Sequence, residues 1–241
     1  MITKISLSVK EGSMPAKKVA AAILKKLVEE KEEAVILTFV LTEYNREQMS
    51  EKTIAIERIA NDMLIKEGGY FNELLAGQKK VLITSLPVVK KKAPETTDVV
   101  KGYEDRIRVH EIKFRLADAY TPRTTPGRVD LSVKEDSKSA GAVASRILRT
   151  LLVDEKDCVL NFVVSAKNNL KMCEKVLSVE RIMKRMLKDS GNIIHNSLPV
   201  KVKYEVECYA PIMVREKIKL TEGEESPVDN ITVHEILFVA K

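Results

Sequence analysis

The sequence contains no tryptophan, and aromatic residues make up only 5% of its 241 residues. This scarcity argues against a carbohydrate-binding aromatic platform and against base stacking as a main source of binding energy. Cysteine is also rare, since Cys158, Cys173 and Cys208 form no CxxC pair and are odd in number. A disulfide framework and a zinc ribbon are therefore excluded, neither a metal nor a cofactor is predicted, and a reducing cytoplasm is the expected compartment.

Long apolar runs are missing as well. The longest, residues 34–41, contains a threonine and falls far short of the roughly 18 residues that a membrane-spanning helix needs. The first seven residues alternate instead of forming the apolar block of a signal peptide, so we expect neither export nor a membrane partner. The chain is instead 44% hydrophobic and 32% charged, with a net charge of +6. This composition predicts a folded globular protein, and the positive excess alone is weak evidence for a nucleic-acid partner.

An internal duplication organises the chain. Residues 7–11 recur as residues 131–135, an offset of 124, and the helical pattern that follows keeps this register. The offset is 123 at Phe39 and Phe162, and it returns to 124 where residues 109–112 match residues 233–236. Two compensating one-residue slips indicate a common origin of the two halves.

Between the copies, residues 117–127 contain two prolines, a glycine and three threonines without periodicity, which is typical of a linker. We therefore predict a first domain over residues 1–118, a linker over 119–127 and a second domain over 128–241.

Each copy predicts the element order β-α-β-α-β-β. Apolar alternation predicts a first strand around Leu7 and Leu131, and apolar stripes at helical spacing predict the helix that follows each of them. Ser13 and Ser137 are the expected N-caps of these helices. Near-continuous apolar runs at 34–41 and 159–164 are typical of central strands.

The remaining elements of each copy follow from the same patterns. Second helices are expected over about 49–64 and 172–187, with Gly68 and Gly69 ending the first of them. Two further strands per copy, near 81–89 and 107–116 and near 204–214 and 231–239, flank long charged segments. Such segments between pairable strands predict extended β-arms.

Residues 131–144 resemble the start of the stage V sporulation protein S family, which opens with a strand, a Lys/Ser-rich turn and an Ala/Val-rich helix. Residues 168–181 are similar to the asparagine-containing loop and second helix of the same family. That family and archaeal Alba belong to the Alba-like group, whose element order and long arm between the last two strands match each copy. Before the first helix, residues 14–18 only approximate the Gly-Lys-Lys-Pro turn of archaeal Alba.

The resemblance implies an α/β fold of the two-layer α+β kind, with two tandem Alba-like domains that form an intramolecular pseudo-dimer. Because archaeal Alba is a dimer that binds DNA and RNA, the resemblance also implies a non-enzymatic protein that contacts the phosphates of DNA or RNA with low sequence specificity. The alternative is a protein-interaction or regulatory module, related to the stage V sporulation protein S family, that binds no nucleic acid. Nucleic acid is thus the predicted partner, and self-association of the chain is left open.

Basic residues at three places are the candidate nucleic-acid contacts. Helix N-termini and nearby cations attract phosphate, so one group surrounds the first-helix turns, and a capped helix with solvated lysines is the alternative there. A second group lies on the β-arms, where lysines that protect an edge hairpin from aggregation are the alternative. The full set is Lys10, Lys17 and Lys18 with Lys134, Lys138 and Arg146 at the turns, Lys90, Lys91, Lys92 and Arg106 with Arg215, Lys217 and Lys219 on the arms, and Arg46 before the second helix.

Enzyme motifs are absent from the sequence. It contains no GxGxxG, Walker loop, HExxH or nucleophile elbow. His110 and His234 are expected on the core side of the last strand, with Glu111 and Glu235 on the opposite face, which excludes a His–Glu dyad. Asn45 and Asn168 precede the second helices and are expected to be turn or cap residues. We therefore predict no catalytic residues.

Overall fold

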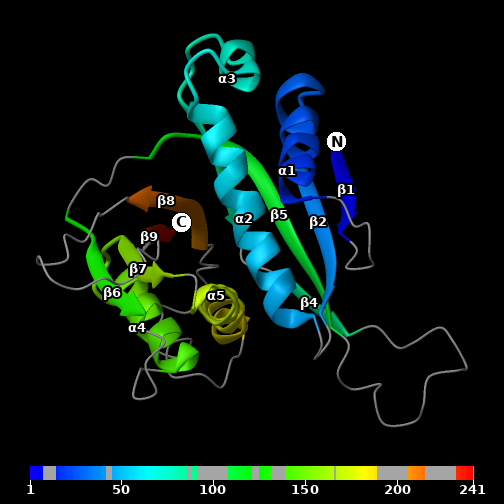
Figure 1. The fold of residues 1–241 in the computed structure, drawn as a ribbon. Helices are drawn as coiled ribbons and strands as arrows, with labels where there is room; N and C mark the ends of the chain where they lie inside the picture. Colours follow the sequence, from blue (N-terminus) through cyan, green and yellow to red (C-terminus); the bar gives the residue numbers. More distant parts are fainter. Residues whose placement is uncertain are drawn as a thin grey trace, which may run out of the picture. The chain divides into compact units, whose positions relative to one another are not determined.

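The computed structural model describes residues 1–7, 15–41, 45–85, 88–91, 108–120, 125–131, 139–165, 167–188, 206–214 and 232–240. The chain divides into two compact units, unit 1 from Met1 to Thr121 and unit 2 from Pro122 to Lys241. The division lies within the stretch that the sequence predicts as a linker. Each unit is of mixed α/β composition (Figure 1).

Unit 1 is built on a sheet with β2 and β5 in its middle. Its elements are β1 (Ile2–Leu7), α1 (Ala16–Leu24), the π-helical turn η1 (Lys25–Glu29), β2 (Ala34–Leu41), α2 (Arg46–Ile65), α3 (Tyr70–Leu74), β3 (Lys80–Ser85), β4 (Val88–Lys91) and β5 (Arg108–Asp118). β2 pairs in parallel with β1 and antiparallel with β5. β3 and β4 both pair antiparallel with β5, so the third predicted strand is present as two segments.

Unit 2 repeats the same order with fewer elements. They are β6 (Gly127–Leu131), α4 (Ala140–Leu152), β7 (Cys158–Val164), α5 (Asn169–Lys188), β8 (Val206–Val214) and β9 (Thr232–Ala240). β7 pairs in parallel with β6 and antiparallel with β9, whose other partner is β8. Both units therefore contain the predicted succession β-α-β-α-β-β among the residues that are described.

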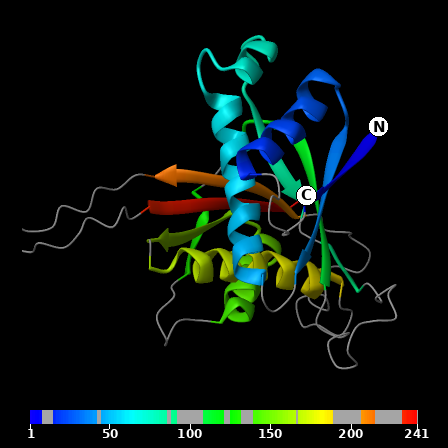
Figure 2. The same ribbon diagram turned by 45° about the vertical axis from the view of Figure 1, so that its right-hand side comes forward.

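The core of each unit lies between its sheet and a pair of adjacent helices, α1 with α2 and α4 with α5 (Figures 1 and 2). Alternation sends every second strand residue toward the helices. Phe39 of β2 and Phe114 of β5 lie on paired strands of unit 1, and Phe162 of β7 and Phe238 of β9 hold the equivalent positions in unit 2. All four are almost completely buried, so the two cores are built alike.

The opposite face of each sheet carries a repeated ion pair. Lys4 of β1 lies 3.6 Å from Glu111 of β5, and Arg128 of β6 lies 3.3 Å from Glu235 of β9. Both pairs reach across the middle strand at equivalent positions. The glutamates therefore face away from the core, as alternation predicts. Because these groups are partly exposed, each pair contributes about 1 kcal/mol or less.

The helix starts differ from the prediction. Ser13 and Ser137 were expected as N-caps, but α1 begins after Pro15 and α4 begins after Ser139. The Ser139 hydroxyl accepts a hydrogen bond from the backbone N–H of Ala142 at 3.2 Å, which is the usual N-cap interaction. For α4 the expectation was wrong because serine occurs at both 137 and 139, and the local pattern does not distinguish them. For α1 the N-cap residue is Pro15, which provides no side-chain cap.

The glycine pair after α2 has two roles. Gly68 adopts a left-handed φ of 66°, as a residue that follows a helix end often does, which agrees with the predicted stop. Gly69 then starts the short helix α3, which the sequence did not predict. A Cβ on Gly69 would lie 2.8 Å from the carbonyl oxygen of Lys66, so glycine is needed there for close backbone packing.

The first one-residue slip of the duplication can be placed in the structure. Lys31 and Glu155 both have a left-handed φ, of 52° and 51°, and they are related by the offset of 124. Val35 pairs with Thr3 and Cys158 pairs with Gly127, so the middle strands are related by an offset of 123. The extra residue of unit 1 therefore lies between Lys31 and Val35.

Candidate nucleic-acid interface

The exposed side of α1 is basic and contains no acidic residue. At about 100° per residue, Lys17, Lys18, Ala21, Ala22 and Lys25 fall within an arc of about 140°. The three lysines are exposed and the two alanines are partly exposed. The buried residues Val19, Ala20, Ile23 and Leu24 occupy the other side of the helix. We call these five exposed positions the unit 1 basic face.

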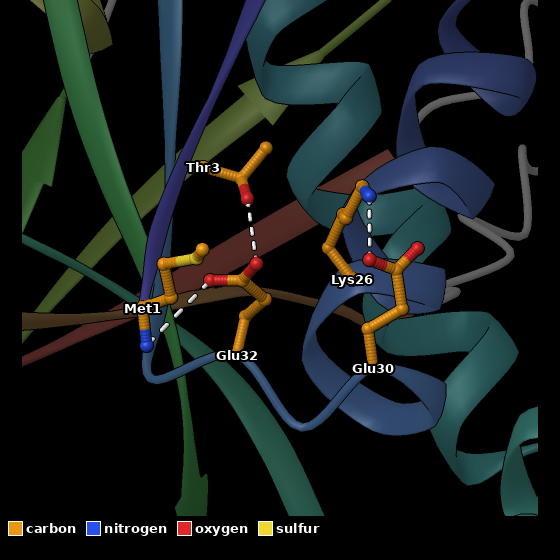
Figure 3. A network of polar contacts seen from close by, with 5 residues as sticks. All are labelled: Met1, Thr3, Lys26, Glu30 and Glu32. Atoms are coloured by element: carbon orange, nitrogen blue, oxygen red, sulfur yellow. Dashed lines mark hydrogen bonds and ion pairs between the residues drawn. The ribbon is translucent and has the colours of Figure 1, made fainter.

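Nearby acidic residues are engaged with other groups. Glu30 accepts a hydrogen bond from the Lys26 ammonium at 2.5 Å (Figure 3). Glu32 accepts a hydrogen bond from the Thr3 hydroxyl at 2.8 Å and lies 3.8 Å from the amine of Met1, as the same figure shows. Glu29 hydrogen-bonds to Tyr70 and raises the pKa of that phenol.

The described carboxylates therefore do not compensate the charge of the unit 1 basic face. Among the described residues, no carboxylate forms an ion pair with Lys17, Lys18 or Lys25. The first turn of α1 also has neither an acidic residue nor a side-chain cap. An approaching anion therefore meets three solvated cations and a helix N-terminus of partial positive charge.

The equivalent side of α4 has the same character with different residues. At the offset of 124 it consists of Gly141, Ala142, Ser145, Arg146 and Arg149, which we call the unit 2 basic face. Both arginines are exposed, and the first turn of α4 contains no acidic residue. Each basic face thus combines two or three cations with small side chains that allow close approach of a ligand.

Only some of the predicted contacts fall on described residues. Lys17, Lys18 and Arg146 lie on the two basic faces. Arg46 opens α2, and Lys90 and Lys91 lie in β4, but only the backbone of these three residues is described. The other predicted contacts lie outside the described residues: Lys10, Lys92, Arg106, Lys134, Lys138, Arg215, Lys217 and Lys219.

Sequence reasoning missed Lys25 and Arg149, because it concentrated on the helix N-termini. Both residues are exposed, and they occupy the same position of the two repeats at the offset of 124. A basic residue that recurs at an exposed helix position was the signal that could have found them. Arg149 lies in the last turn of α4, where a cation also stabilises the helix dipole, whereas Lys25 follows α1 as the first residue of η1.

The asparagines before the second helices have the predicted local roles. Asn45 occupies the N-cap position of α2, as predicted, but its side chain makes no capping hydrogen bond. The side-chain oxygen of Asn168 accepts a hydrogen bond from the N–H of Ser165 at 2.8 Å, and its amide nitrogen donates to the carbonyl oxygen of Val163 at 3.2 Å. Both ends of the Asn168 amide therefore shape the turn between β7 and α5.

Two buried groups have strongly raised pKa values. Burial raises the pKa of the Cys158 thiol to about 12, although Thr150 and Arg146 act in the opposite direction. Burial also raises the pKa of Glu180 to about 7, with a partly offsetting hydrogen bond from Cys208. Within the described ranges, no three His, Cys, Asp or Glu side chains gather in a way that could hold a metal ion. No helix among those residues is long and apolar enough to cross a membrane.

Comparison of the chain with protein-family models, with curated proteins and with solved structures finds no match.

Proposed function

We propose that the protein binds DNA or RNA without catalysis, through contacts of the two basic faces with phosphates and with low sequence specificity. The observation that carries this proposal is that both exposed helix sides have cations and no carboxylate, in a chain with 41 basic and 35 acidic residues. A helix side that serves only solubility is expected to mix both signs, often as i,i+4 pairs such as Lys26 and Glu30.

The size of a basic face suits a polyanion. Lys17 and Lys25 are eight residues apart, which is about 12 Å along a helix. Over 12 Å, duplex DNA carries about seven phosphate charges, more than enough to engage three lysines. The faces contain no aromatic side chain to stack on a base and no asparagine or glutamine to pair with adenine, and their lysines and arginines are residues that commonly contact phosphates. Backbone contact is the recognition that these residues support.

The fold behind this function is, in our proposal, two tandem Alba-like domains that form an intramolecular pseudo-dimer in the cytoplasm. The repeated β-α-β-α-β-β order, the equivalent core phenylalanines and the resemblance at residues 131–144 support the proposal. The predicted β-arm residues belong to the same proposed surface. Reduced cysteines are in keeping with the proposed compartment, since all three thiols are buried and none of them forms a disulfide.

Fluorescence anisotropy with a labelled duplex DNA and a labelled single-stranded RNA tests the function. If the five cations of the two basic faces alone neutralise duplex phosphates, the logarithm of the binding constant falls against the logarithm of salt concentration with a slope of about −4.5, and contacts by the β-arms make this slope steeper. Affinity then drops roughly 500-fold between about 50 and 200 mM salt. A chain that binds neither nucleic acid at the lower salt concentration contradicts the proposal.

A pair of matched variants tests the site. Lys18→Ala with Lys25→Ala removes two charges from the unit 1 basic face, and Lys66→Ala with Lys79→Ala removes two exposed charges elsewhere in unit 1. The first variant is expected to reduce the slope to about −2.7, so that the same salt step weakens binding roughly 40-fold. The second is expected to keep the wild-type slope. Equal slopes for the two variants place the contacts elsewhere.

The alternative function, a protein-interaction module, is favoured by a different observation. Ile65, Tyr70 and Leu74, at the end of α2 and in α3, are 61%, 60% and 48% exposed. Exposed large apolar side chains that occur together are typical of interaction surfaces. Replacing all three by serine is expected to leave the salt-dependent binding of nucleic acid unchanged, and it would remove a partner that docks on this end of unit 1.

A further inference from the structure

The interface between α5 and the sheet of unit 2 contains a buried carboxyl group. Glu180 is 3% exposed and lies among apolar neighbours of its own helix, Val176, Leu177 and Met183, all of which are buried. Within the part of the chain that the structure describes, its hydrogen bond is donated by the Cys208 thiol of β8, with the sulfur 3.5 Å from Oε1. A thiol is a weak donor, so it compensates a buried negative charge poorly.

Few titratable groups surround Glu180. Cys208 faces it from β8, and Cys158, in the same sheet row on β7, hydrogen-bonds to Thr150 of α4 instead. On α5 the charged residue one turn away is Lys184, which has an interaction of its own.

The described residues of β9 and α4 place no charged side chain near the carboxyl group of Glu180. From β9, Phe238 faces the helices, and His234 lies four residues before it with its side chain outside the described residues. The buried side of α4 is entirely aliphatic. Within the described residues, no cation therefore balances an ionised Glu180.

Unit 1 has polar groups at the same two places. Glu57 is related to Glu180 by the offset of 123 and is 2% exposed. Thr84 pairs with Phe114 as Cys208 pairs with Phe238, and it is 1% exposed. Both units thus place a carboxyl group of the second helix and a hydroxyl or thiol of the third strand in the core. The Cys208 thiol of unit 2 is a weaker hydrogen-bond donor than the Thr84 hydroxyl of unit 1.

We propose that Glu180 and Cys208 form a pH-sensitive latch that holds α5 against β8 more tightly in mildly acidic than in mildly alkaline solution. The protonated carboxyl group is neutral and tolerates burial, whereas the carboxylate is stabilised by leaving the core for water. The latch concerns the internal dynamics of unit 2 and does not depend on nucleic-acid binding.

The direction of the effect follows from proton linkage. The pKa of Glu180 is about 7 when buried and near its ordinary value of 4.5 when solvated. In the closed state, Glu180 therefore keeps its proton to a higher pH than in the open state. The resulting stabilisation of the closed state is complete below a pH of about 4.5 and is lost as the pH rises through about 7. With these values, opening becomes roughly 40-fold more favourable from pH 5 to pH 7 and only about twofold more from pH 7 to pH 8.

The accessibility of Cys208 reports the opening. The rate at which N-ethylmaleimide labels Cys208 in the native chain, followed by peptide mass mapping, is divided by the rate in the urea-unfolded chain at the same pH. This ratio removes the pH dependence of the thiol itself. It is expected to rise about 40-fold from pH 5 to pH 7 in the wild type and to stay flat in Glu180→Gln. An equal rise in both proteins overturns the latch.

A second variant keeps the test decisive if Glu180→Gln does not fold. Cys208→Ser places a stronger donor beside the carboxylate, and unit 1 has a hydroxyl residue, Thr84, at the equivalent strand position. The urea midpoint of unfolding is then expected to change less between pH 5 and pH 7 than it does in the wild type. An unchanged pH dependence in Cys208→Ser overturns the proposal.

Discussion

Gly127, at the start of β6, permits a close approach of strand and helix that no other residue allows. A Cβ built on Gly127 would lie 2.5 Å from Cγ2 of Thr150 in α4, well inside van der Waals contact. Gly127 does not have a left-handed φ, so a substitution there is resisted by this contact and not by the backbone. Gly127→Ala is therefore a steric probe of how β6 packs on α4.

Neither partner can move away easily. Thr150 is β-branched and restricted at χ1 in a helix, and its hydroxyl donates to the carbonyl oxygen of Arg146 at 3.1 Å. The N–H of Gly127 donates to the carbonyl oxygen of Asp157 at 2.8 Å. Overpacking of this kind costs about 1–3 kcal/mol, and the lower chain entropy of unfolded alanine returns about 0.4–1 kcal/mol. We expect a net loss of roughly 1–2 kcal/mol in the stability of unit 2.

Thr150→Ser provides the matched rescue, because it deletes Cγ2 and keeps the hydroxyl. Hydrogen exchange of the α4 amides, measured by mass spectrometry, gives the opening free energy of all four members of the mutant cycle, and amides of α2 serve as the internal reference. The Gly127→Ala penalty is expected to disappear in the Thr150→Ser background, giving a coupling of about 1–2 kcal/mol. Wild-type protection in Gly127→Ala, or an undiminished penalty in the double variant, refutes the steric argument.

Two further predictions concern the partly buried Asn61 and the buried Cys158. The Asn61 amide accepts a hydrogen bond from the N–H of Leu82 at 3.0 Å and donates one to the carbonyl oxygen of Leu82 at 3.4 Å. Asn61→Ala is therefore expected to lower the free energy of unfolding, measured in urea, by about 1–3 kcal/mol. A loss below about 0.5 kcal/mol would mean that water replaces the amide. Because the pKa of Cys158 is raised to about 12, this thiol is expected to resist iodoacetamide in the native chain at pH 8 and to react after unfolding, as peptide mapping can measure. Native labelling at the unfolded rate contradicts the burial of Cys158.

The order of the elements was predictable because periodicity reports directly which face of an element is buried. The apolar runs that became β2 and β7, and the helical stripe around Ile23 and Ile147, carry that signal strongly. Short-range features were less predictable. The five-residue helix α3 is too short for a periodic pattern, and the glycine pair before it is equally compatible with a simple helix end.

The candidate site was predictable in kind but not in its residues. Charge patterns led to Lys17, Lys18 and Arg146, but the exposed side of each helix emerged only once its buried side was known. Glu180 was missed for the opposite reason, because a glutamate on a helix is ordinarily solvated. Its position three residues after Leu177 and three before Met183, within the apolar stripe, was the available signal. The same glutamate recurs as Glu57 in the first copy.

Comparison of the two copies separates positions that need particular geometry from those that need only charge. The cross-strand ion pair recurs at the same two positions in both units, since an ion pair requires both partners in register. The basic faces recur differently: Lys17 and Lys18 match Gly141 and Ala142, Ala22 matches Arg146, and only Lys25 matches another cation, Arg149. Positive charge is thus present on both faces while its placement differs.

A catalytic site shared by the two copies would need the same residues at the same positions, whereas attraction to a phosphate backbone depends mainly on the number of cations within reach. The way in which the copies differ is therefore an argument for polyanion binding that is separate from the charge itself.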